Sequence, residues 1–280
     1  MRFGAQLTDA MDRLGPLCVG IDPHASLLQA WGLDDTPTGL AAFGETVVDA
    51  AKGTAAVLKP NAAFFERHGA KGMAALEYVL GKAREAEVLT ILDAKRGDIG
   101  STMEGYADAF LRPGAPFECD ALTVSPYLGF GSLEPALSLA AEHGKGVFVL
   151  ALTSNPEGKS VQHARSADGE LVAQSMVRQA AERNAGAEPM GDVGLVVGAT
   201  VGSAVSDLGI GLEGLNGPIL APGVGAQGGT AEELSQVFGN SRHLVLVNQS
   251  RGVLQAGPFT EKLRGAIQAA AQAAQHALRA

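Results

Sequence analysis

The sequence predicts an α/β fold, a single (β/α)₈ or TIM barrel over residues 1–280 with a helix before the first strand. Three observations lead to this prediction. Short apolar runs are separated by amphipathic segments of helical length, and there are eight such runs. Within each run, polar and apolar residues barely alternate, as in strands buried on both faces. Strict alternation of strands and helices indicates a parallel sheet, and eight repeats in about 250 residues favour a closed barrel over an open doubly wound sheet. Because no linker divides the chain, we expect one domain.

Each apolar run has the length and the Val, Leu and Ile content of a buried strand. In chain order, the predicted strands cover residues 17–22, 55–60, 88–95, 120–125, 146–152, 193–199, 218–224 and 243–249. The other segments have the amphipathic pattern of surface helices. In chain order, the predicted helices cover residues 3–14, 39–52, 71–86, 102–112, 133–143, 169–185, 202–208, 230–238 and 260–279. Gly15 ends the first of them, since glycine commonly follows the last residue of a helix.

The composition is that of a globular protein, with 46% hydrophobic and 18% charged residues. A net charge of −9 and the lack of any Lys/Arg cluster argue against binding of nucleic acid. Cys18 and Cys119 lie in or beside apolar runs without the spacing of metal ligands, so reduced thiols are favoured over a disulfide. The N-terminus lacks the apolar stretch of a signal peptide, and no run approaches ~20 apolar residues. We therefore expect a cytoplasmic protein that does not enter a membrane.

Charged residues occur where the predicted strands end, which is where barrels of this kind hold their active sites. Asp22 ends the first strand, Lys59 the second, and Asp93 and Lys95 the third, with Asp98 in the following loop. The period of two in a strand would put Asp93 and Lys95 on one face, so that with Asp98 three charges crowd one spot. The triplet alone could be a surface salt-bridge network. Charges from three strands at one mouth favour function, because buried ion pairs rarely improve stability.

The loops after the last two strands have the features of a phosphate site. Residues 222–229 are rich in glycine, and residues 248–252 include Arg251. Barrels commonly bind phosphate in these loops through backbone N–H groups and an arginine, so Gln227 and Arg251 are the candidate ligands. Residues 223–228 also match G-x-G-x-x-G. A dinucleotide fold is not favoured, because the motif lies late in the chain and no acid ends the next strand.

Several motifs together resemble the orotidine 5′-phosphate decarboxylase family. They are Asp22 after the first strand, Lys59 in LKPN, the D-x-K-x-x-D of Asp93, Lys95 and Asp98, and PGVGAQGG at 222–229. The resemblance spans nearly all eight predicted strands. LTSNPEG at 152–158 and VNQSRG at 247–252 are similar to the longer-chain, type 2 branch of that family.

The resemblance implies a carboxy-lyase of pyrimidine (UMP) biosynthesis that converts orotidine 5′-phosphate to uridine 5′-phosphate and CO₂. It implies no metal and no other cofactor, and a homodimer with shared active sites. Lys95 would protonate C6 of the pyrimidine, Asp93 would lie against the substrate carboxylate, and Lys59 would hold Asp93 and a ribose hydroxyl. Asp98 would be the fourth catalytic residue and would reach into the partner subunit's site.

The remaining residues that the resemblance implies would bind the substrate. They are Asp22 at the ribose, Ile99 and Thr102 in the partner subunit's site, Ser154 at the pyrimidine edge, Pro222 beside the base, and Gln227 and Arg251 at the 5′-phosphate.

Two alternatives remain at this stage. D-x-K-x-x-D also occurs in Mg²⁺-dependent sugar-phosphate decarboxylases and synthases of the same barrel group, but these carry an acidic metal ligand where this chain has Lys59-Pro60-Asn61. A non-catalytic protein that binds a phosphoribosyl ligand is the second alternative. The complete set of lysines and aspartates argues against it.

Overall fold

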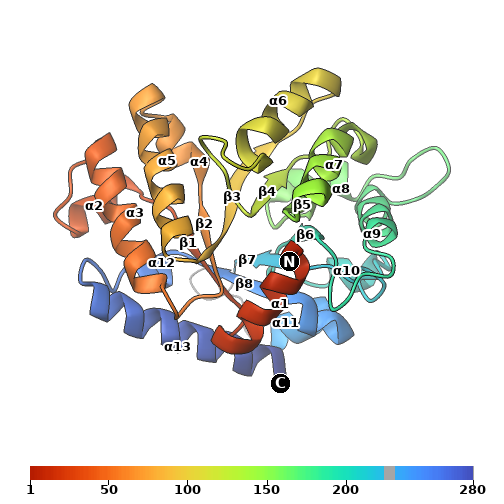
Figure 1. The fold of residues 1–280 in the computed structure, drawn as a ribbon. Coiled ribbons are helices and arrows are strands. Elements are labelled where there is room, and N and C mark those ends of the chain that lie inside the picture. The colour runs from red at the N-terminus through yellow and green to blue at the C-terminus, as the bar shows by residue number, and fades with distance from the viewer. Residues whose placement is uncertain (224–230, 280) are drawn as a thin grey trace.

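Eight parallel strands close on themselves in residues 1–223 and 231–279, the part of the chain that this computed structural model describes (Figure 1). Each strand pairs with the next, and the first closes the barrel by pairing with the last. The strands are β1 (Leu17–Ile21), β2 (Val57–Pro60), β3 (Leu89–Arg96), β4 (Ala121–Val124), β5 (Gly146–Leu152), β6 (Val193–Val197), β7 (Ile219–Pro222) and β8 (Val245–Gln249). The predicted barrel is confirmed, with strand ends that differ by up to two residues.

Helices surround the strands, as the amphipathic segments predict (Figure 1). The predicted ones that form are α1 (Phe3–Leu14), α3 (Pro37–Ala51), α5 (Gly69–Glu85), α6 (Gly100–Leu111), α7 (Glu134–His143), α9 (Val172–Arg183), α11 (Ala231–Phe238) and α13 (Thr260–Arg279). The helix predicted over 202–208 is reduced to one turn, α10 (Ala204–Asp207). Gly202 and Gly209 flank it with φ of +63° and +67°, which a right-handed helix cannot contain.

Short helices in the loops were not predicted, because four to six residues are too few to show a helical period. They are α2 (Ala25–Ala30), α4 (Ala62–Glu66), α8 (Lys159–Gln162) and α12 (Arg251–Leu254), with 3₁₀ turns at Phe130–Leu133, Pro156–Gly158 and Gly239–Leu244. α2, α4 and α12 follow the carboxyl ends of β1, β2 and β8, so they form walls around one mouth of the barrel. Among the described residues, no helix is both long enough and apolar enough to cross a membrane.

The first helix packs at the amino ends of β5 and β6. The Phe3 ring is fully buried and meets Phe148 edge to face, with ring centres 6.0 Å apart. It occupies the space that a side chain on Gly146 would take, since a Cβ there would lie 2.4 Å from the ring. The backbone N–H of Gly4 has no partner within its helix and donates to Asp192 Oδ1 at 2.8 Å. The amino end of α1 is therefore fixed by one ring and one carboxylate.

We expect Phe3→Ala to lower the free energy of unfolding by about 3–5 kcal/mol, because it removes a buried aromatic ring and leaves a cavity. Urea denaturation followed by circular dichroism measures the loss. Phe259→Ala is the control: that ring is 63% exposed, so its removal should change stability by no more than about 0.5 kcal/mol. Equal effects of the two substitutions would contradict the role given to Phe3.

Candidate active site

Two lysines hold one carboxylate at the carboxyl ends of β2 and β3. Lys59 Nζ lies 2.8 Å from Asp93 Oδ2, and Lys95 Nζ lies 2.6 Å from Asp93 Oδ1. The side chains of Lys59 and Asp93 are 7% and 10% exposed, whereas that of Lys95 is 51% exposed. The cluster therefore has a buried half that stays paired and one ammonium group that faces solvent.

Both members of the buried pair are charged at neutral pH. Burial is the largest influence on Asp93 and raises its pKa, but Lys59 and Lys95 together outweigh it and hold that pKa well below the usual range. Burial is also the largest influence on Lys59 and lowers its pKa, but the Asp93 and Asp22 carboxylates outweigh it and raise that pKa above its ordinary value. Asp93 therefore presents a fixed negative charge inside the barrel.

The two cysteines of the chain have neutral thiols, which are poor nucleophiles. Burial raises the pKa of Cys18 in β1 to about 12, despite the opposing effect of the Lys59 charge. Cys119 is also free and buried, and burial raises its pKa to about 12. Both thiols are thus neutral at physiological pH and unpaired, as the sequence predicted.

Lys95 reaches Asp93 through an irregular backbone, and the regular alternation predicted for residues 88–95 is wrong at this point. β3 pairs with β4 at Leu92↔Leu122, but the next pair is Arg96↔Val124, so β3 gains residues relative to its neighbour. Lys95 itself has φ of +47°, in the left-handed region. The bulge in β3, rather than a period of two, directs the ammonium group back to the carboxylate.

Asp98 does not join this cluster in the same chain. Its carboxylate accepts a hydrogen bond from the Ile99 backbone N–H at 2.8 Å and forms no salt bridge with any described residue. Ile99 and Thr102, at the start of α6, are both exposed. Within one chain, no hydrogen bond or salt bridge joins Asp98 to Asp93 or Lys95, whereas Lys59 pairs with Asp93.

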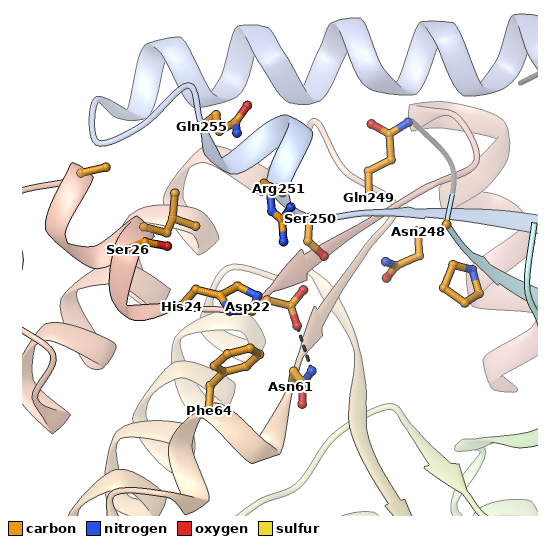
Figure 2. A pocket seen from close by; sticks show the side chains of 14 residues that line it. Asp22, His24, Ser26, Asn61, Phe64, Asn248, Gln249, Ser250, Arg251 and Gln255 are labelled. Carbon is orange, nitrogen blue, oxygen red and sulfur yellow. Dashed lines mark hydrogen bonds between the residues drawn. The ribbon is translucent and has the colours of Figure 1, made fainter. Parts of the chain in front are cut away.

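A cavity of about 830 Å³ opens beside the cluster, at the carboxyl ends of β1, β2, β7 and β8 (Figure 2). Three predicted site residues line it: Asp22, Pro222 and Arg251. Asn61 connects the cavity to the charge cluster, because its Nδ2 donates to Asp22 Oδ1 at 2.9 Å and its backbone pairs with that of Asp93. The Arg251 guanidinium enters from α12 and makes no salt bridge with a described residue.

This cavity is not lined by the four catalytic candidates, nor by Ile99 or Thr102. Ser154, which follows β5, is exposed and does not line it. Gln227 lies outside the described residues. Within the part of the chain that the structure describes, no three His, Cys, Asp or Glu side chains gather where they could hold a metal ion.

Sequence reasoning missed Gly20, Asn61 and Asn248. A Cβ on Gly20 would lie 2.0 Å from Ser250 Oγ, so only glycine lets β1 and the loop after β8 approach. A glycine inside a strand was the available signal for such an approach. Asn61 was noted at the end of a strand but was given no role. Asn248 is a buried polar residue that lines the cavity, and its Oδ1 has no hydrogen-bond partner among the described residues.

Comparisons with known proteins point to one family. The sequence model of the orotidine 5′-phosphate decarboxylase / HUMPS family matches residues 15–266 of this chain. The chain is 58% identical over 265 residues to the orotidine 5′-phosphate decarboxylase of Streptomyces coelicolor, covering 94% of each protein. It is 52% identical over 268 residues to that of Corynebacterium efficiens, covering 95% of this chain and 94% of the relative.

Comparison with solved structures points to the same family. A crystal structure of a Streptomyces avermitilis protein has a TM-score of 0.95 and 55% identity, covering 100% of this chain and 96% of that one. The OMP decarboxylase of Leishmania donovani has a TM-score of 0.77 and 30% identity, with both chains covered completely. The fold is thus similar to these structures over the whole chain.

We expect Lys59→Met to lower the free energy of unfolding by about 3 kcal/mol at pH 7, the low end of the cost of removing one partner of a buried ion pair, because Lys95 still contacts Asp93. In the wild type, the lowered pKa of Asp93 stabilises the fold at every pH above its ordinary value of about 3.9, and this is lost only as pH falls through the folded-state pKa. The raised pKa of Lys59 stabilises the fold below about pH 10.4, so neither contribution changes near pH 7.

In the variant, burial raises the pKa of Asp93 with less opposition, so protonation relieves the unpaired charge. The difference in unfolding free energy from the wild type should therefore shrink between pH 7 and pH 4. Urea denaturation at both pH values measures it, with Lys71→Met as the control on an exposed helical position. A difference that stays constant, or grows, with falling pH would contradict the assignment of a buried charge to Asp93.

Proposed function

The chain belongs to the orotidine 5′-phosphate decarboxylase / HUMPS family, and from this premise we propose a metal-free mechanism in which Lys95 is the proton donor. The chain is a carboxy-lyase of UMP biosynthesis, an orotidine 5′-phosphate decarboxylase by its relatives. The observation that carries the mechanism is the buried Asp93 carboxylate between Lys59 and the half-exposed Lys95, beside the cavity.

The reaction breaks the bond between C6 and the carboxylate carbon, and CO₂ leaves without the bonding electrons. The electron pair remains on C6, which then takes one proton, so substrate and proton become uridine 5′-phosphate and CO₂. Lys95 supplies that proton and, before its transfer, stabilises the developing negative charge at short range. Its exposed ammonium group can regain a proton from water, whereas the buried Lys59 cannot do so readily.

Asp93 is proposed to act on the substrate carboxylate. Its charge is maintained by two lysines, so it does not take up a proton when a second carboxylate approaches. Repulsion between the two carboxylates is present in the bound substrate and disappears as CO₂ leaves, which lowers the barrier. Lys59 keeps Asp93 ionised and oriented, and it offers its remaining protons to a ribose hydroxyl.

The cavity supports binding of the ribose and the phosphate. Asp22, held by Asn61, provides a carboxylate for the ribose hydroxyls. Arg251 provides a guanidinium that no described carboxylate neutralises, as a site for a phosphate dianion requires. We place Pro222 beside the base, Ser154 at the pyrimidine edge, and Gln227 at the phosphate.

We also propose a homodimer with shared sites. Ile99 follows β3, and Tyr127 and Leu128 follow β4, and all three are large apolar residues exposed in this chain. Exposed apolar residues on neighbouring loops are typical of an interface between proteins. Asp98 has no cationic partner among the described residues of its own chain, so a site across the interface would give its carboxylate a role there, with Ile99 and Thr102 beside it.

Ultraviolet absorbance of orotidine 5′-phosphate with purified protein and excess EDTA tests the mechanism. We expect rapid loss of absorbance in the presence of the chelator, and a fall in kcat of at least about 10³-fold in Lys95→Ala, since this removes both the acid and the nearest positive charge. Lys71→Ala, on an exposed helical face, should leave kcat unchanged.

Three results would contradict the mechanism. Loss of activity on adding EDTA, restored by Mg²⁺, would favour the metal-dependent alternative. Tight binding of uridine 5′-phosphate without any turnover would favour a protein that only binds phosphoribosyl ligands. Full activity of Lys95→Ala would remove Lys95 from the role of acid while leaving the decarboxylase activity in place.

Mixing two inactive variants tests the shared site. In a dimer of one Asp98→Ala chain and one Lys95→Ala chain, one of the two sites combines an intact Lys95 with an intact Asp98. We expect an equimolar mixture to recover up to about a quarter of wild-type activity after random exchange of subunits in a two-fold dimer. No recovery, with exchange demonstrated by mass spectrometry of differently tagged chains, would rule out the shared site.

A further inference from the structure

The hydroxyl group of Thr123 makes the contacts that hold the bulge of β3. Thr123 is a buried residue of β4. Its Oγ1 accepts hydrogen bonds from the backbone N–H groups of Ala94 at 3.1 Å and of Lys95 at 3.0 Å. The same oxygen lies 3.1 Å from Asp93 Oδ1 and donates to it. One side chain thus contacts three consecutive residues of the charge cluster.

These bonds use the full capacity of the hydroxyl. A threonine oxygen can accept two hydrogen bonds and donate one. The two accepted bonds come from successive backbone N–H groups, and the single proton has two acceptors in reach, Asp93 Oδ1 at 3.1 Å and Leu92 O at 3.5 Å. The shorter bond to the charged acceptor is the favoured one.

The backbone at Lys95 needs such support, because a residue with a Cβ is strained at φ of +47°. In a regular parallel strand its N–H would bond to a carbonyl of the neighbouring strand. Here the hydroxyl of Thr123 replaces that carbonyl, and strained backbone persists only where the surroundings fix it.

The bulge is also closed at its far end. The Ser125 backbone N–H donates to the Arg96 carbonyl at 2.7 Å, which restores pairing with β4. A Cβ on Gly97 would lie 2.4 Å from the Ser125 carbonyl oxygen, so the backbones are in close contact there. Residues 94 and 95 are therefore held between two fixed points, and Thr123 fills the gap between them.

We propose that Thr123 is a positioning residue of the decarboxylase: its hydroxyl fixes the backbone of Lys95 and the carboxylate of Asp93, so that the Lys95 ammonium group is directed at the reacting carbon. This inference rests on the proposed role of Lys95 as the acid. Thr123 does not touch the substrate. It acts because a displacement of about 1 Å in a catalytic group can cost about 10²-fold in rate.

Thr123→Val tests the proposal, because valine keeps the shape of threonine and replaces its hydroxyl with a methyl group. We expect kcat to fall by about 10²-fold while KM for orotidine 5′-phosphate changes by less than about threefold, since the ribose and phosphate residues lie on other loops. Thr123→Ser restores a hydroxyl and should return kcat to within about threefold of the wild type.

Thr90→Val is the matched control for the loss of a buried threonine hydroxyl. Thr90 is a buried residue of β3 whose Oγ1 donates to Asp120 Oδ2 at 3.0 Å and accepts from the Asp120 N–H at 3.2 Å, near the opposite end of the strand. This variant should lower the unfolding midpoint in urea, as Thr123→Val does, but leave kcat unchanged. An equal fall in kcat in both variants would show that general destabilisation causes it and would overturn the proposal.

Two further results separate this proposal from the role of Lys95. A folded Thr123→Val with wild-type kcat, in a protein whose Lys95→Ala variant is inactive, would overturn the proposal alone. The crystal structure of Thr123→Val provides a measurement that does not depend on activity. We expect Lys95 to leave the left-handed region and its Nζ to move away from Asp93 Oδ1. An unchanged Lys95 backbone would overturn the proposal whatever the kinetics show.

Discussion

A carboxylate buried between two ammonium groups is the interaction on which the rest of the site depends. Asp93 could not remain ionised at this depth alone, because desolvation favours its neutral form. Lys59 could not remain charged there without Asp93. Each charge therefore requires the other, and both require that β2 and β3 stay adjacent in a fixed register, as the pairs Val57↔Leu89 and Leu58↔Thr90 ensure. Such a pair adds little stability, and the role that we propose for it is to present a permanent negative charge to the substrate carboxylate.

Closure of the barrel brings the second half of the site to that charge. Asp22 follows the first strand and Arg251 follows the last, yet both line one cavity because β1 and β8 pair directly. β1 and Ser250 lie so close together that a Cβ on Gly20 would collide with the Ser250 hydroxyl. The successive pairing of β1, β2 and β3 places Asn61 between Asp22 and the backbone of Asp93, so the cavity and the charge cluster share one connecting residue.

The charge cluster depends on a local departure from regular strand pairing in β3. The regular pairing of β3 with β4 is interrupted between Leu92 and Arg96, where Lys95 points back at Asp93. Lys95 has a strained backbone conformation at this point. The saturated hydroxyl of Thr123 and the restored pair at Arg96 hold this conformation. Strain of this kind is typical of functional sites, where the surroundings over-determine a conformation that the chain alone would avoid. The flexible lysine side chain is thereby attached to a rigid base.

The barrel and most of the charged residues at its mouth could be predicted from the sequence alone, because buried strands, surface helices and polar strand ends leave local patterns in it. Asp22, Lys59, Asp93 and Lys95 could be selected in this way. The contacts of Lys59 with Asp93, of Asn61 with Asp22 and of Thr123 with the bulge became visible only in the fold. Those contacts join residues about thirty or more positions apart, and one depends on a left-handed residue. Neither long-range distance nor local strain has a signature in sequence periodicity, which reports only which face of an element is buried.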